Sequence, residues 1–179
     1  MFFSNIVIRV LRGVFNRVNN NMPFKKCGVN LIIRSLSFYC WNPNVVVGNN
    51  VQIYPGVLFF GDGDIVIEDD VKIGNNVVIN ASKKNGGIKI GKGTIVAANS
   101  YIIDSNHGIK LGTPICDQES DASPLYIGKY CWIGANCTLG RGTNLGDGCV
   151  VGANSFVNKT FETNSIVAGT PARFIKERV

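Results

Sequence analysis

The chain contains a single histidine, His107, in the stretch IIDSNHGI at residues 102–109. Imidazole titrates near neutral pH, so it is well suited to take a proton from a substrate and return it. A lone histidine is otherwise a structural residue, and its surroundings decide between the two roles. The regular pattern of the chain stops at His107, and residues 108–126 form an excursion of irregular sequence. Excursions of that length in a compact domain are usually functional, which favours a chemical role for His107.

Cysteine is the second residue type that could do chemistry, and the chain has six. None of them has the paired C-x2-C spacing of a zinc site, so no metal centre is predicted. Cys131, Cys137 and Cys149 recur in the small-residue position of a repeat and are expected to be structural thiols. Cys116 lies in the irregular excursion, where a nucleophilic role stays open as the minor alternative.

The element that must position His107 is a six-residue repeat. From residue 127 the chain reads IGKYCW-IGANCT-LGRGTN-LGDGCV-VGANSF-VNKTFE. The aliphatic anchors of these hexads are Ile127, Ile133, Leu139, Leu145, Val151 and Val157. The period continues upstream, with interruptions, through Val47, Ile53, Ile67, Ile73, Ile79, Ile90, Val96 and Ile102. A period of six fits neither an α-helix nor a hairpin meander, and it is typical of short strands joined by tight corners.

The corners between these strands also have a signature. Triplets such as GNN, GKG, GAN and GDG supply the Gly and Asn that adopt positive φ at tight corners. The anchors would point inward, and the small residue of each hexad would pack beside them. The sequence therefore predicts an all-β fold, a parallel β-solenoid over residues 45–168 with three faces per turn. Its coils would lie about 4.8 Å apart, with residues 108–126 protruding as a loop.

The N-terminal segment carries a different pattern. Apolar residues at helical spacing between Phe3 and Val18 predict an amphipathic helix, so we assign residues 1–44 to a helix and a cap. This helix either covers the open edge of the first coil or lies on an anionic membrane surface, because arginines flank its apolar stripe. Neither a charged signal region nor a run of about 18 apolar residues is present. We therefore expect a cytoplasmic protein, with any membrane contact peripheral and at the inner face.

The composition of the chain is that of one folded domain. Of its 179 residues, 45% are hydrophobic and 17% are charged. The net charge of +6 suggests an anionic partner. Nucleic acid would satisfy the charge alone, but the positive residues are scattered and no nucleic-acid-binding motif is present. We therefore expect a phosphate-bearing co-substrate or an anionic membrane surface as the partner, and no nucleic acid.

The repeats, the histidine after the middle coils, the WIG sequence that restarts the pattern and the GTPAR ending together resemble the hexapeptide-repeat acyltransferases. The resemblance covers about residues 45–176 and is to the branch of galactoside, maltose and polysaccharide O-acetyltransferases. It implies a left-handed β-helix, a homotrimer, and acetyl-CoA bound in a groove between neighbouring subunits. It also implies direct acetyl transfer to a sugar hydroxyl, with His107 as general base and without an acyl-enzyme or a required metal.

The same resemblance suggests roles for further residues. Asp104, or a main-chain carbonyl, would orient the ring of His107. Asn80 would bind the acceptor. The equal alternative is that Asn80 is a solvated corner residue without a binding role. Residues 169–179 would form a CoA-binding tail. The full set of residues expected along the CoA groove is Trp132, Ala135, Ala153, Asn158, Lys159, Arg173 and Lys176.

The acceptor is narrowed by one departure from the family pattern. The chain reads NHGI where family members that act on small free sugars usually read Gly-His-Pro. This variant resembles the capsule and lipopolysaccharide O-acetyltransferases, which implies a surface-polysaccharide precursor, lipid-linked ones included. Two alternatives stay open: an N-acetyltransferase for a nucleotide-linked amino sugar, and a non-catalytic β-solenoid used for binding or assembly. A γ-type carbonic anhydrase is excluded, because it needs three histidines and the chain has one.

Overall fold

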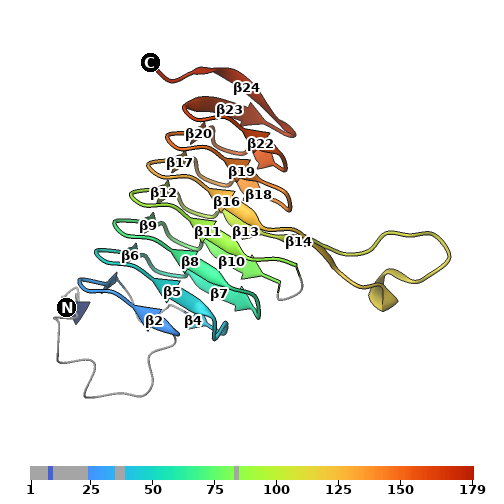
Figure 1. The fold of residues 1–179 in the computed structure, drawn as a ribbon, viewed down its shortest axis with the longest axis horizontal. Coiled ribbons are helices and arrows are strands. Elements are labelled where there is room, and N and C mark those ends of the chain that lie inside the picture. The colour runs from blue at the N-terminus through green and yellow to red at the C-terminus, as the bar shows by residue number, and fades with distance from the viewer. Residues whose placement is uncertain (1–7, 10–23, 35–38, 83–84) are drawn as a thin grey trace, which may run out of the picture.

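The computed structural model describes residues 8–9, 24–34, 39–82 and 85–179, and the regular elements of this part of the chain are β-strands apart from one 3-10 turn (Figure 1). Short strands form coils stacked along one axis, and a hairpin projects from the middle of the stack. Three sheets result, which we call A, B and C, and each coil runs through B, A and C in turn. The predicted parallel β-solenoid is confirmed.

The strands of the three sheets are short, most of them two or three residues long. Sheet B contains β2 (Lys26–Cys27), β5 (Val45–Val47), β8 (Ile65–Ile67), β11 (Ile88–Ile90), β16 (Leu125–Ile127), β19 (Asn144–Leu145) and β22 (Thr160–Phe161). Sheet A contains β1 (Ile8–Arg9), β3 (Ile32–Ile33), β6 (Gln52–Ile53), β9 (Lys72–Ile73), β12 (Ile95–Val96), β17 (Trp132–Ile133), β20 (Val150–Val151), β23 (Ser165–Gly169) and β24 (Ala172–Glu177). Sheet C contains β4 (Tyr39–Cys40), β7 (Leu58–Gly61), β10 (Val78–Ala81), β13 (Tyr101–Ile103), β18 (Thr138–Leu139) and β21 (Phe156–Val157).

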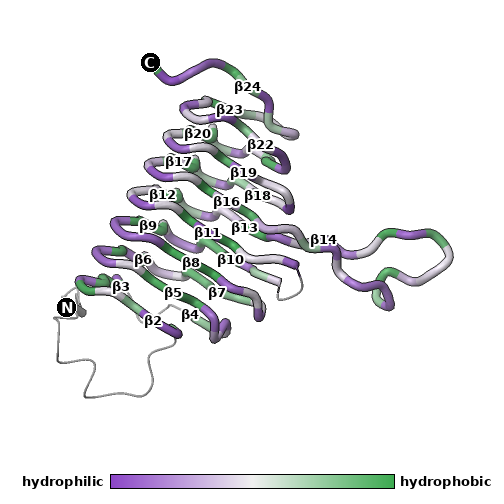
Figure 2. The backbone as a smooth tube through the Cα atoms, viewed as in Figure 1, coloured by the Kyte–Doolittle hydropathy of each residue, from purple (hydrophilic) through white to green (hydrophobic). Residues whose placement is uncertain are grey.

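The centre of the solenoid is filled by the aliphatic anchors of the hexads. All six anchors from Ile127 to Val157 are buried, and so are the eight upstream ones. Anchors stack in register from coil to coil, as Ile133 does on Val151. Figure 2 shows the result as apolar segments that recur in every coil. Burial of one such side chain contributes about 1.5–3 kcal/mol, so the repeat stabilises the stack at every turn.

A second buried ladder occupies the small-residue position. Cys131, Cys137 and Cys149 are buried there, as is Thr94 in an earlier coil. The Thr94 hydroxyl donates to the carbonyl oxygen of Gly128 at 2.8 Å, which satisfies its polar group inside the core. Burial raises the pKa of the Cys137 thiol, and a protonated thiol packs as a small apolar group. The structural role predicted for these three cysteines is confirmed.

The corners have the left-handed backbone that the triplets predicted. Asn76, Asn99 and Asn136 stand at the same corner of successive coils with φ of 56°, 60° and 57°. The side chain of Asn76 donates to that of Asn99 at 3.1 Å, which links two coils. Tyr130 has φ 56° although it is neither Asn nor Gly. A Cβ on Gly93, in the preceding coil, would lie 2.6 Å from the Tyr130 ring, so a glycine is required beneath it.

The stack begins before residue 45. β2, β3 and β4 pair in parallel with β5, β6 and β7, and Phe24 and Leu31 are buried in the same core. Most of the expected amphipathic helix between Phe3 and Val18 lies outside the described residues. The exception is Ile8–Arg9, which forms β1 and pairs antiparallel with β3, so the expected helix is not present there.

The last coil is closed by the C-terminal segment. After β23 the chain reverses, and β24 pairs antiparallel with it. This pairing covers the edge that sheet A would otherwise expose at the end of the stack. In the described part of the chain, no helix has the length and apolarity needed to cross a bilayer.

Candidate active site

His107 lies at the base of the projecting hairpin (Figure 1). Beyond β13 the chain forms β14 (Ser105–Asn106), runs outward, and returns through β15 (Asp121–Ala122). β14 and β15 pair antiparallel, so His107 is the first residue past the paired stem. Its side chain is exposed rather than packed in the core. The excursion expected after the histidine is therefore confirmed.

Two pockets meet at His107. The first has a volume of about 410 Å³ and lies over sheet C, where Asn80, Tyr101 and Ser105 are among its lining residues. The second has a volume of about 730 Å³ and is lined by hairpin residues, including Lys110. We call them the sheet C pocket and the hairpin pocket. Because His107 lines both, its imidazole can serve a group held in either one.

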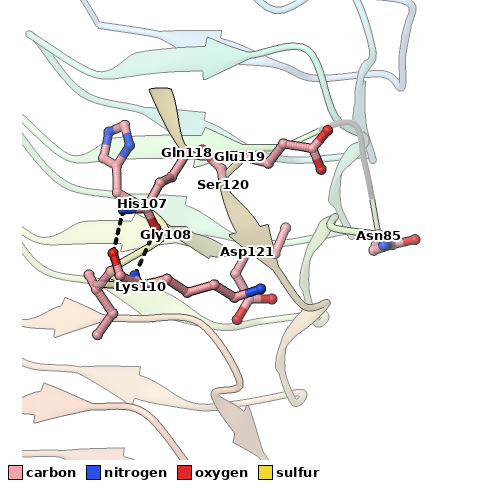
Figure 3. Close-up of a pocket in the computed structure, with 10 residues that line it drawn as sticks. Asn85, His107, Gly108, Lys110, Gln118, Glu119, Ser120 and Asp121 are labelled. Atoms are coloured by element: carbon pink, nitrogen blue, oxygen red, sulfur yellow. Dashed lines mark hydrogen bonds between the residues drawn. The ribbon is translucent and has the colours of Figure 1, made fainter. Parts of the chain in front are cut away.

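Gln118 holds the two arms of the hairpin together (Figure 3). Its side-chain oxygen accepts from the Lys110 amide at 2.8 Å, and its side-chain nitrogen donates to the Lys110 carbonyl at 3.0 Å. The same nitrogen donates to the Thr113 carbonyl at 2.7 Å. The imidazole of His107 points away from these bonds. Gly108 permits the side chain of Gln118 to pack closely against the outgoing arm, because a Cβ on residue 108 would lie 2.7 Å from Cβ of Gln118. The glycine of the NHG sequence thus has a packing reason.

Asp104 anchors the opposite side of the hairpin base. Its side chain is fully buried, and its carboxylate accepts from the Ser82 amide at 2.9 and 3.0 Å and from the Gly87 amide at 2.6 Å. Burial raises the pKa of Asp104, and the hydrogen bonds from these amides oppose that shift. The carboxylate therefore fastens the neighbouring turn of the previous coil. These contacts argue against the expected pairing of Asp104 with the His107 ring.

The returning arm of the hairpin is tied to the next coil by an ion pair. Nη2 of Arg141 lies 2.9 Å from both Oδ1 and Oδ2 of Asp121. Asp121 pairs with Asn106 in the stem, and its side chain is mostly exposed. The hairpin base is thus held from both neighbouring coils, by Asp104 on one side and by Arg141 on the other.

Asn80 projects from β10 toward the sheet C pocket. Its neighbours Ile79 and Ala81 are buried, so Asn80 faces outward and is half-buried. Its side-chain nitrogen donates to the hydroxyl of Tyr101, one coil along, at 3.3 Å. The register pairs Asn80 with Ile103, in the coil that leads to His107. The structure therefore brings the predicted acceptor residue to the same pocket as the predicted base.

Several residues of the sheet C pocket were not expected from the sequence, among them Tyr101, Ser105 and Asn106. A signal for Tyr101 existed, because it directly precedes the buried anchor Ile102 and must therefore face outward. Ser105 and Asn106 had no such signal, since they lie where the repeat ends and their position depends on pairing with β15.

The residues expected to bind CoA fall into two separate groups. Asn158 and Lys159 lie between β21 and β22, at the corner of sheets C and B, where the hairpin also leaves the stack. The other group lies on sheet A and at its corner with sheet C, and consists of Trp132, Ala135, Ala153, Arg173 and Lys176. The strands of sheet C separate the two groups within one chain. The structure therefore does not bring the expected CoA residues together in a single copy.

The alternative nucleophile, Cys116, is not among the lining residues of either pocket. It belongs to a 3-10 turn, η1 (Ile115–Asp117), in the hairpin. Its position gives no support to a covalent mechanism. Within the described ranges, no group of three or more His, Cys, Asp or Glu side chains is placed to hold a metal ion.

Comparison with known proteins points in the same direction as the geometry. A family model described as the hexapeptide repeat of succinyl-transferase matches residues 65–104 and 124–159, and the gap between the matches is the hairpin. A protein of Escherichia coli K12 named as a lipopolysaccharide biosynthesis O-acetyl transferase, WbbJ, is 35% identical over 126 residues, which cover 66% of this chain and 63% of WbbJ. The chain thus spans just under two thirds of the length of that relative.

A second relative is covered more fully. WcaF of E. coli K12, named as a colanic acid biosynthesis acetyltransferase, is 28% identical over 162 residues, which cover 80% of this chain and 82% of WcaF. Among solved structures, a mutant of AntD, an N-acyltransferase from Bacillus cereus, in complex with dTDP and coenzyme A has a TM-score of 0.75 at 22% identity and covers 87% of this chain and 85% of its own. That likeness concerns the fold. The chain belongs to the hexapeptide-repeat acyltransferase family, because its hexads are buried in register, the family model matches on both sides of the hairpin, and its relatives include the acetyltransferases WbbJ and WcaF.

Proposed function

We propose that this protein transfers the acetyl group of acetyl-CoA to a hydroxyl of a sugar in a surface-polysaccharide precursor, lipid-linked precursors included. The observation that carries the proposal is the exposed His107 at the junction of two pockets. The acceptor class is supported by the names of WbbJ and WcaF, which refer to lipopolysaccharide and colanic acid biosynthesis. The coenzyme A in the AntD structure supports the donor.

In this proposal His107 is the general base. A sugar hydroxyl is a weak nucleophile until its proton is removed, and the imidazole accepts that proton as the oxygen attacks the acetyl carbon of the thioester. The bond from that carbon to sulfur breaks, and the imidazolium returns the proton to the leaving thiolate. Asn80 and Tyr101 would hold the acceptor in the sheet C pocket by hydrogen bonds. No side chain of the protein is acylated at any stage.

We further propose that CoA binds between copies of the chain in a homotrimer. The two groups of expected CoA residues lie at different corners of the solenoid, so one copy alone would not surround the ligand. Closed threefold symmetry would set the group that contains Arg173 on one copy against the His107 corner of the next. The cationic side chains of Lys159, Arg173 and Lys176 would then pair with the CoA phosphates.

Mixed oligomers test this shared site. Copies that carry His107→Ala and copies that carry Arg173→Glu are expected to be inactive alone. Refolded or co-expressed together, they should recover activity, because some interfaces combine an intact His107 with an intact Arg173. If the mixtures stay as inactive as the single variants while light scattering shows mixed trimers, both groups act within one chain and the shared site is wrong.

The first alternative is N-acylation of a nucleotide-linked amino sugar, and it is favoured by one observation. AntD, which has the same fold, is an N-acyltransferase and was solved with dTDP. The second alternative, a non-catalytic solenoid, would leave the braced hairpin without a role. The stability of the product toward alkali separates the two enzymes, since an acetyl ester is cleaved by mild alkali and an acetamide is not.

The decisive assay combines purified protein with acetyl-CoA that is radiolabelled in the acetyl group. The acceptors are de-O-acetylated surface oligosaccharides in one series and nucleotide-linked amino sugars in the other. We expect an alkali-labile product from the oligosaccharides only. An alkali-stable product from the amino sugars would establish the first alternative, and glycan binding without any product would establish the second.

As further proposals we give a cytoplasmic location and a division of the chain into residues 1–44, 45–168 and 169–179, although the first coil of the stack, β2 to β4, falls within the first part. Within the first part, the amphipathic segment between Phe3 and Val18 either caps the stack or contacts the inner face of the membrane. Sedimentation of the full chain with anionic liposomes, compared with a truncation that lacks residues 1–18, decides between these roles. If the full chain never sediments with the liposomes, the membrane contact is wrong.

A further inference from the structure

Two aromatic side chains form an exposed pair at the N-terminal end of sheet C. Trp41 is 67% exposed and Phe60 is 43% exposed. Their ring centroids lie 6.2 Å apart, with 63° between the ring planes. Large aromatic groups that a fold leaves at its surface beside polar groups frequently mark a binding site. We call Trp41 and Phe60 the aromatic pair.

The aromatic pair lies in line with the sheet C pocket. Trp41 directly follows β4, whose last residue pairs with Phe59, so Trp41 stands beside Phe60. Phe60 pairs in turn with Asn80, which lines the pocket. One outward column therefore runs from the aromatic pair through Asn80 to the coil that leads to His107. That column spans three coil steps, about 14 Å along the solenoid axis.

The aromatic pair stands on a fixed backbone. Asn42 is 1% exposed, and its side-chain nitrogen donates to the carbonyl oxygens of Phe60 at 3.3 Å and Gly63 at 2.8 Å. Its side-chain oxygen accepts from the amide of Asn44 at 2.7 Å. This buried amide joins the chain after Trp41 to the chain around Phe60. A site whose parts are held in place loses less conformational entropy when a ligand binds.

The chemistry of the column matches a glycan. A pyranose ring has a face of C–H groups, which packs on the electron-rich face of an aromatic ring, and a rim of hydroxyls that need hydrogen-bonding partners. The aromatic pair offers the first kind of surface, and Asn80, Tyr101 and Asp62 offer the second. Among the described residues that line the sheet C pocket, Asp62 is the one carboxylate, and none is a lysine or an arginine. A carboxylate there disfavours the diphosphate of a nucleotide-linked sugar.

We propose that Trp41 and Phe60 form a distal sugar subsite, so that the preferred acceptor is an oligosaccharide that reaches from the aromatic pair to His107. The span exceeds one hexose ring, and a single sugar held at His107 cannot touch Trp41. The subsite therefore selects for chain length. This inference rests on the proposed function, since it assumes that sugar hydroxyls are acetylated beside His107.

The kinetic test uses oligosaccharides of one to six sugar units, obtained by partial hydrolysis of the de-O-acetylated surface polysaccharide of the source cell. In the unmodified protein, KM should fall as the chain lengthens. Trp41→Ala and Phe60→Ala should each raise KM for the six-unit acceptor about tenfold, while kcat/KM for the single sugar stays unchanged. Tyr126→Ala is the matched control, because Tyr126 is 47% exposed on a strand of sheet B. It should change neither value.

Failure of this inference differs from failure of the proposed function. If no acceptor of any length is acetylated on oxygen, the proposed function is wrong. If acetylation occurs but KM is independent of chain length, or if Trp41→Ala affects all lengths equally, the distal subsite is wrong. A variant that dissociates the oligomer in light scattering, with KM for the long acceptor unchanged, would assign the aromatic pair to an interface between copies instead.

A second measurement does not depend on turnover. The chain has two tryptophans, Trp41 and Trp132, so Trp132→Phe leaves Trp41 as the sole tryptophan reporter. Titration with the six-unit oligosaccharide should shift its emission, and titration with the single sugar should not. An emission that responds to neither sugar would overturn the subsite even if the kinetic variants misfold.

Discussion

The coils from Leu125 to Phe161 and the hairpin at His107 differ in how their structure is held. In the coils, the inward residues are buried, and amide groups donate to the next coil along, as Gly134 does to Val151 at 2.8 Å. In the hairpin, Ile109 and Leu111 are 83% and 102% exposed, and a few polar side chains supply the bracing. The coils are stabilised by many equivalent contacts, whereas the hairpin depends on single residues. Substitutions should therefore separate stability from activity.

The largest effect is expected from removing an anchor of the stack. Ile133→Ala should lower the free energy of unfolding by about 2–5 kcal/mol, because Ile133 is fully buried and its loss leaves a cavity. Urea denaturation measures the change. The matched control is Ile109→Ala in the hairpin, which should change the free energy by less than about 0.5 kcal/mol. Equal losses from the two variants would contradict the contrast between coils and hairpin.

At His107 we expect the opposite result, a loss of activity without a loss of stability. His107→Ala should lower kcat/KM for acetyl transfer about 100-fold or more, since a general base of this kind contributes that much. The melting temperature should stay within about 1 °C of the unmodified protein, because the side chain is exposed. Near-normal turnover of a folded variant would remove His107 from the chemistry.

The two carboxylates at the hairpin base sharpen the contrast between buried and exposed braces. Asp104→Ala should cost about 2 kcal/mol of stability, because it leaves the amides of Ser82 and Gly87 without their acceptor. Asp121→Ala breaks a largely exposed ion pair with Arg141 and should cost less than about 1 kcal/mol. Thermal unfolding of both variants checks the ranking, and the opposite order would show that the turn at Ser82 is not held by Asp104.

A small effect on stability is also expected at Gln118. Gln118→Ala removes three side-chain hydrogen bonds of the hairpin, and no core contact is lost because Gln118 lies outside the hydrophobic core. Unfolding should change by less than about 0.5 kcal/mol, whereas hydrogen exchange of the Lys110 amide should accelerate. Acetyl transfer should fall several-fold. Gln118→Glu keeps an acceptor for the Lys110 amide, so its acetyl-transfer activity should lie between those of the unmodified protein and the alanine variant. Unchanged exchange in the alanine variant would mean that other contacts brace the hairpin.

Much of the fold was predictable because the hexads are local. Ile127, Ile133 and Leu139 mark one complete coil within a short stretch of chain. Each of their strands pairs in register with the equivalent strand of the coil before. The first coil escaped prediction because the residues in register with the anchors Val47 and Ile53 are Cys27 and Ile33, and a cysteine does not mark an aliphatic anchor. The site was predictable at His107, where the repeat visibly stops. It was not predictable at Asp104, whose partners Ser82 and Gly87 lie 22 and 17 residues away.

The sequence by itself determined the solenoid, the position of the hairpin and the one residue with the right chemistry. Each of these follows from a period of six and from the place where it is interrupted, and both can be read along the chain. Only the tertiary structure decided which surface residues meet. It set Asn80 beside Tyr101, and it separated Ala135 from Lys159 by the width of sheet C. The reason is physical: inward positions pack against equivalents of themselves, whereas outward neighbours depend on how many residues each intervening corner and loop contains.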